Sequence, residues 1–328
     1  MKALLCKEAG LADKLAIEEV DDPAAGKGQV LLDVHAAGLN FPDTLMISGK
    51  YQFAPDHPYI PGGEASGVVA CLGEGVKGFA VGDRVIATML TGAFAEKVVV
   101  PAAAVTAMPD EMEYRTGAGM SVTYGTSYHA LKQCAGLKEG DTLLVLGAAG
   151  GVGLAAVELG NAMGAKVIAA ASTDEKLAVA EAAGASMTVN YSDEDLKSRV
   201  KELAGPGGVD VVYDPVGGEL SDPALRCLGA GGRFLVIGFA AGDIPRIPLN
   251  LVLLKECHIV GVFWGAWARR EPKTQAKNVA AMMKMFRDGK IKPLVADVFE
   301  FRDYGAAFER ITSRQAKGKV ILELIPRD

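Results

Sequence analysis

A glycine cluster behind an apolar run constrains the fold of this chain more than any other feature. The stretch GAAGGVG occupies residues 147–153, between an apolar run at 142–146 and a helical pattern at 152–163. Glycines let the backbone turn tightly and approach a phosphate, and a helix N-terminus offers N–H groups and a positive dipole end. A strand, a glycine loop and a helix in this order are typical of dinucleotide-binding sites. The spacing is G-x-x-G-x-x-G rather than G-x-G-x-x-G, so a purely structural turn is the alternative.

The segments around and after this loop alternate between strand and helix patterns. Apolar runs predict strands at residues 142–146, 166–171, 187–189, 209–213, 232–237 and 258–262. Amphipathic segments predict helices at residues 152–163, 175–183 and 196–203. Continuous apolar strands separated by helices indicate a parallel sheet that is covered on both faces. We therefore expect an α/β domain built on a doubly wound parallel sheet of the Rossmann type.

The first 120 or so residues have a different texture. Short strand patterns at residues 29–35, 65–71, 84–87 and 95–100 are separated by turns rich in Gly and Pro, which indicates an antiparallel or barrel-like domain. Near the C-terminus the sequence predicts helices at 274–287 and 304–313 and a strand at 319–324. A chain of 328 residues suggests two domains, and this tail is able to rejoin the first one. The nucleotide-type domain would then occupy the middle of the chain.

The end of the second apolar strand bears on the choice of dinucleotide. An NAD site usually carries Asp or Glu there to accept a hydrogen bond from the ribose, whereas this chain has Ser172, followed by Lys176 one helical turn later. A hydroxyl and a lysine suit the 2′-phosphate of NADP(H), which carries nearly two negative charges. Two alternatives stay open: Ser172 or Thr173 only caps the helix, or Asp174 reaches a ribose hydroxyl.

Composition and charge exclude several classes of protein. There are 34 Lys and Arg against 40 Asp and Glu, a net charge of −6, and no basic block, so we expect neither nucleic acid nor a membrane as partner. The five cysteines include no C-x-x-C pair, so neither a disulfide framework nor a cysteine zinc knuckle is indicated. Residues 1–8 lack the hydrophobic run of a signal peptide, and glycines and charges interrupt the stretch at 142–171. We expect a cytoplasmic protein.

Five motifs in this order make the chain resemble a known family. They are GLNFPDT at 38–44, PGGEASG at 61–67, VGDRV at 81–85, GGVG at 150–153 and KGKV at 317–320. The chain resembles, over essentially its whole length, the zinc-independent quinone oxidoreductase (zeta-crystallin-like) branch of the medium-chain dehydrogenase/reductase superfamily. The resemblance implies a GroES-like β-barrel catalytic domain at 1–122, a Rossmann NADP(H)-binding domain at 123–263, and a return to the catalytic domain at 264–328. It also implies a cofactor cleft between the domains and homodimers formed through the Rossmann sheet edge near residues 259–263.

The resemblance further implies a set of site residues. Those carried over to cofactor binding are Asn40, Thr123, Gly147, Gly150, Gly151, Val152, Gly153, Ser172, Lys176, Tyr191, Phe239, Ala240, Phe263, Trp264 and Lys319. Those carried over to catalysis are Asn40, Tyr51 and Thr123. Met46 departs from the pattern, because several relatives carry a tyrosine there.

The same positions bear on metal use. Zinc-using relatives place Cys at the position of Asn40 and His at that of Gly63, and they carry a four-cysteine lobe. A catalytic zinc needs three protein ligands, and Asp43 and Glu64 alone do not make that set. We therefore expect no metal.

Without a metal to polarise a carbonyl, an acceptor that is already electron-poor is favoured. The leading hypothesis is NADPH-dependent reduction of a quinone, and the second is reduction of an α,β-unsaturated carbonyl in an enone, enal or enoyl thioester. The third is a non-enzymatic, crystallin-like protein that binds NADPH or RNA. Asn40, Tyr51 and Trp264 are the candidate donors to an oxyanion that develops on the acceptor.

Overall fold

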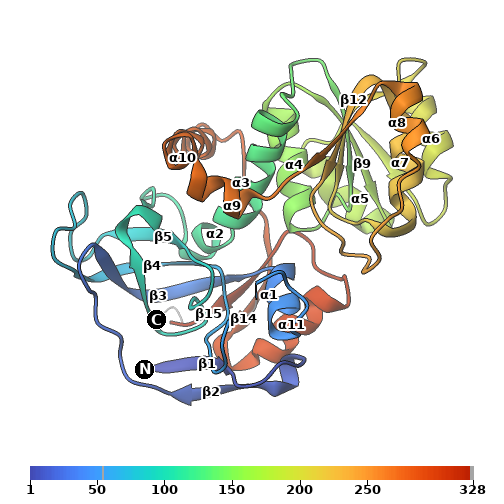
Figure 1. Cartoon of the computed structure of the whole chain (residues 1–328). Coiled ribbons are helices and arrows are strands. Elements are labelled where there is room, and N and C mark those ends of the chain that lie inside the picture. Colours follow the sequence, from blue (N-terminus) through green and yellow to red (C-terminus); the bar gives the residue numbers. More distant parts are fainter. Residues whose placement is uncertain (54, 326–328) are drawn as a thin grey trace. The chain divides into compact units, whose positions relative to one another are not determined.

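The computed structural model describes residues 1–53 and 55–325, which form two compact units. The first unit comprises residues 1–122 together with 293–328, and the second comprises residues 123–292 (Figure 1). The chain therefore leaves the first unit once and returns to it once.

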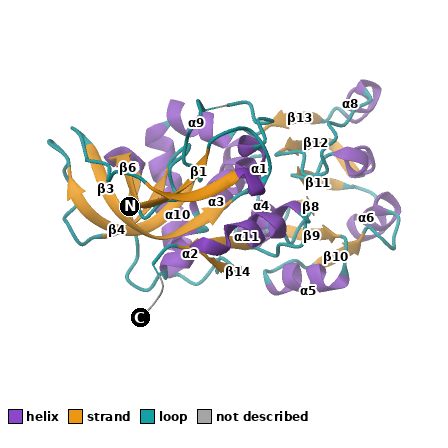
Figure 2. Cartoon of the chain, turned by 90° about the horizontal axis from the view of Figure 1, so that it is seen from below, coloured by secondary structure: helices purple, strands orange, loops and turns teal. Residues whose placement is uncertain are grey.

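The second unit is built on a six-stranded parallel sheet with the order β10-β9-β8-β11-β12-β13 (Figure 2). Its strands are β8 (Thr142–Leu146), β9 (Lys166–Ala171), β10 (Met187–Asn190), β11 (Val209–Asp214), β12 (Leu228–Val236) and β13 (His258–Gly261). Its crossover helices are α4 (Gly151–Ala162), α5 (Asp174–Ala182), α6 (Leu196–Ala204), α7 (Ser221–Cys227) and α8 (Leu249–Lys255). Helix α4 lies on one side of the sheet and α6, α7 and α8 lie on the other (Figure 1). The predicted parallel α/β sheet is confirmed, with β8 and β9 at the predicted bounds.

The strand order reverses between β8 and β11. From β8 the chain proceeds outward through β9 to β10, and from β11 it proceeds outward in the opposite direction through β12 to β13. In open parallel sheets, ligands bind at the carboxyl ends of the strands at this switch point. The loops after β8 and β11 are therefore the first place to look for a site.

The first unit is mainly antiparallel. Its larger sheet has the order β14-β15-β3-β4-β5-β7, with β6 also paired to β3, and its smaller sheet pairs β1 with β2. The strands are β1 (Lys2–Cys6), β2 (Leu15–Glu19), β3 (Gln29–Leu39), β4 (Glu64–Leu72), β5 (Arg84–Thr88), β6 (Lys97–Pro101), β7 (Val105–Ala107), β14 (Val295–Glu300) and β15 (Lys319–Glu323). The helices are α1 (Phe41–Ile47), α2 (Tyr114–Ala118) and α11 (Tyr304–Thr312), and α3 (Ser121–His129) begins in this unit and ends in the second.

The C-terminal segment completes the core of the first unit. Strand β15 pairs antiparallel with β3, so that Val320 lies opposite Leu39. Phe308 of α11 is buried and meets Phe94 edge-on, with ring centroids 6.2 Å apart. The return of the chain is thus held by sheet pairing and by aromatic packing.

Residues 264–292 lie in the second unit rather than in the return segment, which differs from the predicted division at 263. They form α9 (Trp264–Arg270) and α10 (Pro272–Arg287). The Trp264 ring packs so closely on Gly125 that a Cβ there would lie 2.6 Å from it, and the rings of Trp267 and His129 stack 3.9 Å apart. These contacts to α3 hold the two helices in the second unit, and the return begins at Pro293.

Among the described residues, no helix has both the length and the apolar character needed to span a membrane.

Candidate functional site

The glycine loop after β8 is shaped by close backbone contacts. Gly147 has a φ of +57°, which favours glycine, and a Cβ on Gly153 would lie 2.2 Å from the carbonyl oxygen of Gly147. Gly150 caps α4, which begins at Gly151. A side chain at 153 would clash with the backbone of the loop at Gly147, and a side chain at 147 would meet the Val216 side chain. The conformation of the loop therefore requires glycine at these positions. The glycines also leave the N-terminus of α4 with no side chain in front of it.

The loop after β11 lies beside the glycine loop. A Cβ on Gly147 would lie 2.9 Å from Val216. The buried Asp214 carboxylate fixes this second loop, because it accepts the N–H groups of Val216 and Gly217 at 2.8 Å and the Ser221 hydroxyl at 2.6 Å. Burial raises the pKa of Asp214, and these three hydrogen bonds oppose that rise.

Phe239 and Ala240 are held against the loop after β11. The Ala240 N–H donates to the Pro215 carbonyl at 3.1 Å, and a Cβ on Gly217 would lie 2.9 Å from the Phe239 ring. Two predicted residues distant in sequence from the glycine loop thus reach the same end of the sheet. Sequence reasoning missed the role of Asp214, although the DPVGG stretch at 214–218, with glycines directly after a strand, was a usable signal.

A polar turn follows β9 at the same carboxyl edge of the sheet. The Lys176 ammonium donates to the Ser172 hydroxyl at 3.2 Å. The N-cap of α5 is Thr173, whose hydroxyl accepts the Lys176 backbone N–H at 3.3 Å. Because Thr173 takes the capping role, Ser172 is not needed for it. Ser172 and Lys176 form a hydroxyl–ammonium pair of the kind that binds a phosphate.

Tyr191 follows β10 beside this turn. Its backbone N–H donates to Ala171 at 3.1 Å, and the neighbouring Ser192 hydroxyl donates to the Ser172 carbonyl at 2.9 Å. The structure thus brings together Ser172, Lys176 and the segment that contains Tyr191, three of the residues that the resemblance assigns to the cofactor.

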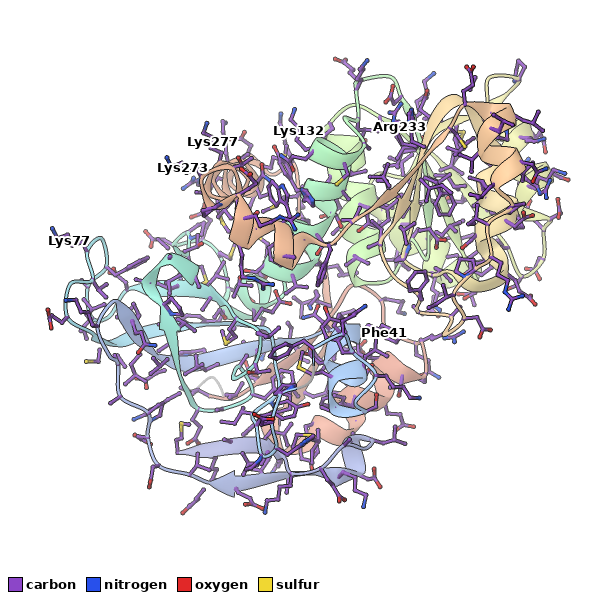
Figure 3. The ribbon with its side chains drawn as sticks, viewed as in Figure 1. Phe41, Lys77, Lys132, Arg233, Lys273 and Lys277 are labelled. Carbon is purple, nitrogen blue, oxygen red and sulfur yellow. The ribbon has the colours of Figure 1, made fainter. Side chains whose placement is uncertain are left out.

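In the first unit, the Asn40 side chain is fully engaged. Asn40 directly precedes Phe41, the first residue of α1 (Figure 3). Its amide nitrogen donates to the Glu64 carboxylate at 2.9 Å and to the Gly38 carbonyl at 3.4 Å, and its amide oxygen accepts from Lys319 at 2.7 Å. Both amide hydrogens are therefore used in hydrogen bonds within the first unit. Asn40 would have to break one of these bonds to donate to a bound substrate.

Lys319 is buried in this network, with a side chain only 4% exposed. Its ammonium donates to the Leu39 carbonyl at 3.2 Å, to Asn40 at 2.7 Å and to the Glu64 carboxylate at 2.8 Å. Three acceptors match the three hydrogens of an ammonium. Lys319 therefore holds Asn40 and neutralises Glu64, whereas the sequence predicted a cofactor contact for it. The salt bridge joins residues 255 positions apart, and sequence spacing gave no signal for it.

Two further predicted donors are also placed by the fold. The Trp264 indole N–H donates to the Gln275 side chain at 3.2 Å, which occupies the hydrogen that the sequence assigned to an oxyanion. Tyr51 is partly buried against the core of the first unit. Thr123 is buried in α3 of the second unit, and Phe263, the residue before α9, is 58% exposed.

Asp43 is a buried acid next to this network. Burial raises its pKa to about 7, while the Asn40 N–H, which donates to it at 2.7 Å, and the Lys319 charge act in the opposite direction. Within the part of the chain that is described, no three His, Cys, Asp or Glu side chains lie together as a metal site.

We predict that Asp43→Asn changes how stability depends on pH. The folded-state pKa of about 7 lies above the unfolded value of 3.8, so the folded state binds more protons between these values. The free energy of unfolding of the wild type should therefore fall as the pH rises from about 4 to about 7. The substituted amide keeps an oxygen to accept the Asn40 N–H but does not titrate, so this component, up to about 4 kcal/mol, should vanish.

The measurement is urea unfolding at several pH values between 4 and 8. Asp13→Asn is the matched control, because Asp13 is an exposed aspartate of the same unit. Equal pH dependence in wild type and Asp43→Asn would contradict the prediction.

Comparison with known proteins agrees with this architecture. Residues 26–110 match the family model for an alcohol dehydrogenase GroES-like domain, and residues 151–282 match that for a zinc-binding dehydrogenase. The chain is 39% identical over 324 residues to quinone oxidoreductase-like protein 2 of Bos taurus, covering 98% of this chain and 92% of the relative.

Two solved structures extend the comparison. Quinone oxidoreductase from Thermus thermophilus, solved alone and in complex with NADPH, has a TM-score of 0.86 and 34% identity, covering 99% of this chain and 100% of the other. The CurK enoyl reductase has a TM-score of 0.89 and 25% identity, covering 99% of each chain. The predicted combination of a Rossmann sheet and a GroES-like domain is confirmed. The chain belongs to the zinc-independent quinone oxidoreductase branch of the medium-chain dehydrogenase/reductase superfamily.

Proposed function

We propose that the protein is an NADPH-dependent oxidoreductase that transfers hydride to a quinone without a metal. The observation that carries the proposal is the Ser172–Lys176 pair at the carboxyl end of β9, where an NAD site usually has an acid. The relative from Thermus thermophilus, which is named a quinone oxidoreductase and was solved with NADPH, supports the same cofactor and acceptor.

The residues of the second unit fit a dinucleotide phosphate. Gly150, the N-cap residue of α4, places no side chain in front of the α4 N-terminus, where backbone N–H groups and the helix dipole favour a pyrophosphate. Lys176 and Ser172 would hold the 2′-phosphate, together with Tyr191. Phe239 and Ala240 lie at the switch point, where they would border the nicotinamide. When bound, NADPH supplies the hydride.

On the acceptor side we assign the oxyanion donor to Tyr51. The Asn40 amide hydrogens are directed to Glu64 and Gly38, so we give Asn40 a positioning role through its contact with Lys319. A donor aimed at a developing oxyanion lowers the barrier to hydride transfer. A quinone is already electrophilic, so a modest contribution from Tyr51 suffices.

The charges of the first unit support metal-free chemistry. The Lys319 ammonium lies 2.8 Å from Glu64 and neutralises the carboxylate that would have to face a cation. Gly63 offers no side-chain ligand, and Asn40 already accepts from Lys319. A zinc ion here would therefore compete with a fixed, buried positive charge.

Reduction of an α,β-unsaturated carbonyl is the second candidate. The likeness to an enoyl reductase over 99% of the chain favours it specifically. Both reactions need the same hydride and the same donor to the oxyanion. They differ in the molecule that accepts the hydride, so rates with the two kinds of acceptor distinguish them.

The first prediction under this proposal concerns Lys176. A charged hydrogen bond contributes about 1.5–3 kcal/mol, so Lys176→Ala should raise the dissociation constant for NADPH roughly 10- to 150-fold. NADH lacks the 2′-phosphate, and its affinity should hardly change. The measurement is cofactor binding by fluorescence titration, with the exposed Lys201→Ala of α6 as the matched control. Equal weakening of both cofactors would show that Lys176 supports the fold instead.

The second concerns the reaction. Wild-type protein should oxidise NADPH with 1,4-benzoquinone faster than with an enone, and a chelator should not reduce the rate. Tyr51→Phe should slow single-turnover hydride transfer roughly tenfold, about 1.4 kcal/mol, because one donor to the oxyanion is lost. Its affinity for NADPH should stay unchanged. Tyr304→Phe is the matched control, since the Tyr304 hydroxyl donates to the Leu15 carbonyl in the same unit. A rate lost in chelator would overturn metal-free catalysis, and a faster enone reaction would favour the second candidate.

We also propose that the protein is a cytoplasmic homodimer formed through β13, the edge strand of the parallel sheet. Exposed apolar side chains gather in the adjoining segments of sequence: Leu249 (74%), Leu253 (77%), Leu254 (75%), Ile259 (39%) and Phe263 (58%). An unpaired strand edge with apolar neighbours is typical of an interface between subunits.

Sedimentation equilibrium checks the dimer. Ile259→Lys places a charge on the edge strand and should convert a dimer into monomers. Leu11→Lys, at a 71% exposed position of the first unit, should leave the dimer intact. A wild type that sediments as a monomer, or an Ile259→Lys variant that stays dimeric, would refute this interface.

A further inference from the structure

Asn190 lies at the polar turn that we assign to the 2′-phosphate. It is the last residue of β10, where it pairs with Ala171, the residue before Ser172. It is 8% exposed, so its polar groups must find partners within the protein.

The Asn190 side chain binds two carboxylates at once. Its amide nitrogen donates to Asp174 and to Asp193, each at 2.8 Å. Its amide oxygen accepts the Ser192 N–H at 3.2 Å, and its own backbone N–H donates to Glu194 at 3.0 Å. Every hydrogen of the amide is thus used to hold an acid in place.

These acids oppose the effect of Lys176 on the binding of a phosphate at this turn. Asp174 and Glu175 directly precede Lys176 in the sequence, and Asn190 holds Asp174, Asp193 and Glu194 by hydrogen bonds. A 2′-phosphate carries close to two negative charges, which a nearby carboxylate repels. A carboxylate at this edge is also the group that accepts from the ribose hydroxyl of NAD. The residue types at the turn therefore do not distinguish NADPH from NADH. We infer that the positions of the carboxylates determine which cofactor binds more tightly.

We propose that Asn190 sets cofactor specificity, by holding the Asp174 and Asp193 carboxylates in fixed positions at the turn that contains Ser172 and Lys176. The inference rests on the proposed use of NADPH, and it adds a positioning residue that does not itself bind the phosphate. Asp174 begins α5, two residues after Ser172, so an untethered Asp174 carboxylate is close enough in sequence to act on the same ligand.

The test is a double-mutant cycle on cofactor preference. Dissociation constants for NADPH and NADH are measured by fluorescence for wild type, Asn190→Ala, Asp174→Ala and the double variant. Asn190→Ala should lower the wild-type preference for NADPH at least tenfold, because it releases the carboxylates. Adding Asp174→Ala should restore most of that preference, since one of the released charges is gone.

A purely structural role for Asn190 would give a different result. It would weaken both cofactors equally, leave their ratio unchanged, and show no rescue by Asp174→Ala; this outcome would overturn the inference. Asn278→Ala is the matched control, because Asn278 is a buried amide of the same unit that is hydrogen-bonded to Gln133. It should leave the ratio unchanged.

Two outcomes are kept separate by the design. If wild type itself shows no preference for NADPH, the proposed function fails, whatever the variants do. If wild type prefers NADPH and Asn190→Ala keeps the full preference, only the inference about Asn190 fails. Should Asn190→Ala not fold, as judged by thermal unfolding, Asn190→Ser replaces it, because a hydroxyl has one hydrogen and cannot donate to both carboxylates.

Discussion

The buried salt bridge between Lys319 and Glu64 connects segments of the first unit that are far apart in the sequence. Lys319 begins the last strand, β15, and Glu64 begins β4, so the bridge fastens the returning chain to the sheet. The second Glu64 oxygen accepts the Val122 N–H at 2.8 Å, at the point where the chain leaves this unit. Two buried charges are tolerated because each is hydrogen-bonded and paired, whereas removing either one would leave the other uncompensated. The position of Asn40 follows from this bridge.

Buried asparagine amides have the same physical role in both units. Asn40 links a carboxylate to an ammonium in the first unit, and Asn190 links two carboxylates in the second. An amide carries hydrogen-bond donors and an acceptor but no charge, so it can hold charged neighbours in place without changing the net charge of the group. In each unit the amide thus fixes the positions of charged side chains.

Much of the second unit was predictable from the sequence because its pattern is local. Strands β8 and β9 are continuous apolar runs bounded by polar residues and turns, and their ends were predicted to the residue. The glycine loop, Ser172 and Lys176 lie directly after these strands, so their positions follow from the strand ends. The predictions missed β1, β2, β7 and β14, together with α1, α2, α3, α7, α8 and α9. Several of these are only three to seven residues long, and too short for a periodic pattern to stand out.

The sequence by itself determined a parallel α/β sheet, a glycine loop at its switch point and a hydroxyl–lysine pair at the end of β9, because each depends on residues close together in the chain. Only the tertiary structure decided which side chains remain available. Lys319 and Trp264 both carry N–H groups suited to a ligand, yet Lys319 is bound by Leu39, Asn40 and Glu64, and Trp264 donates to Gln275. Glu64 lies 255 positions from its lysine, and Asn190 at the end of β10 reaches back to Asp174 at the start of α5. Hydrogen bonds are formed by proximity in space, so residue types alone indicate what a side chain can bind, and packing settles what it does bind.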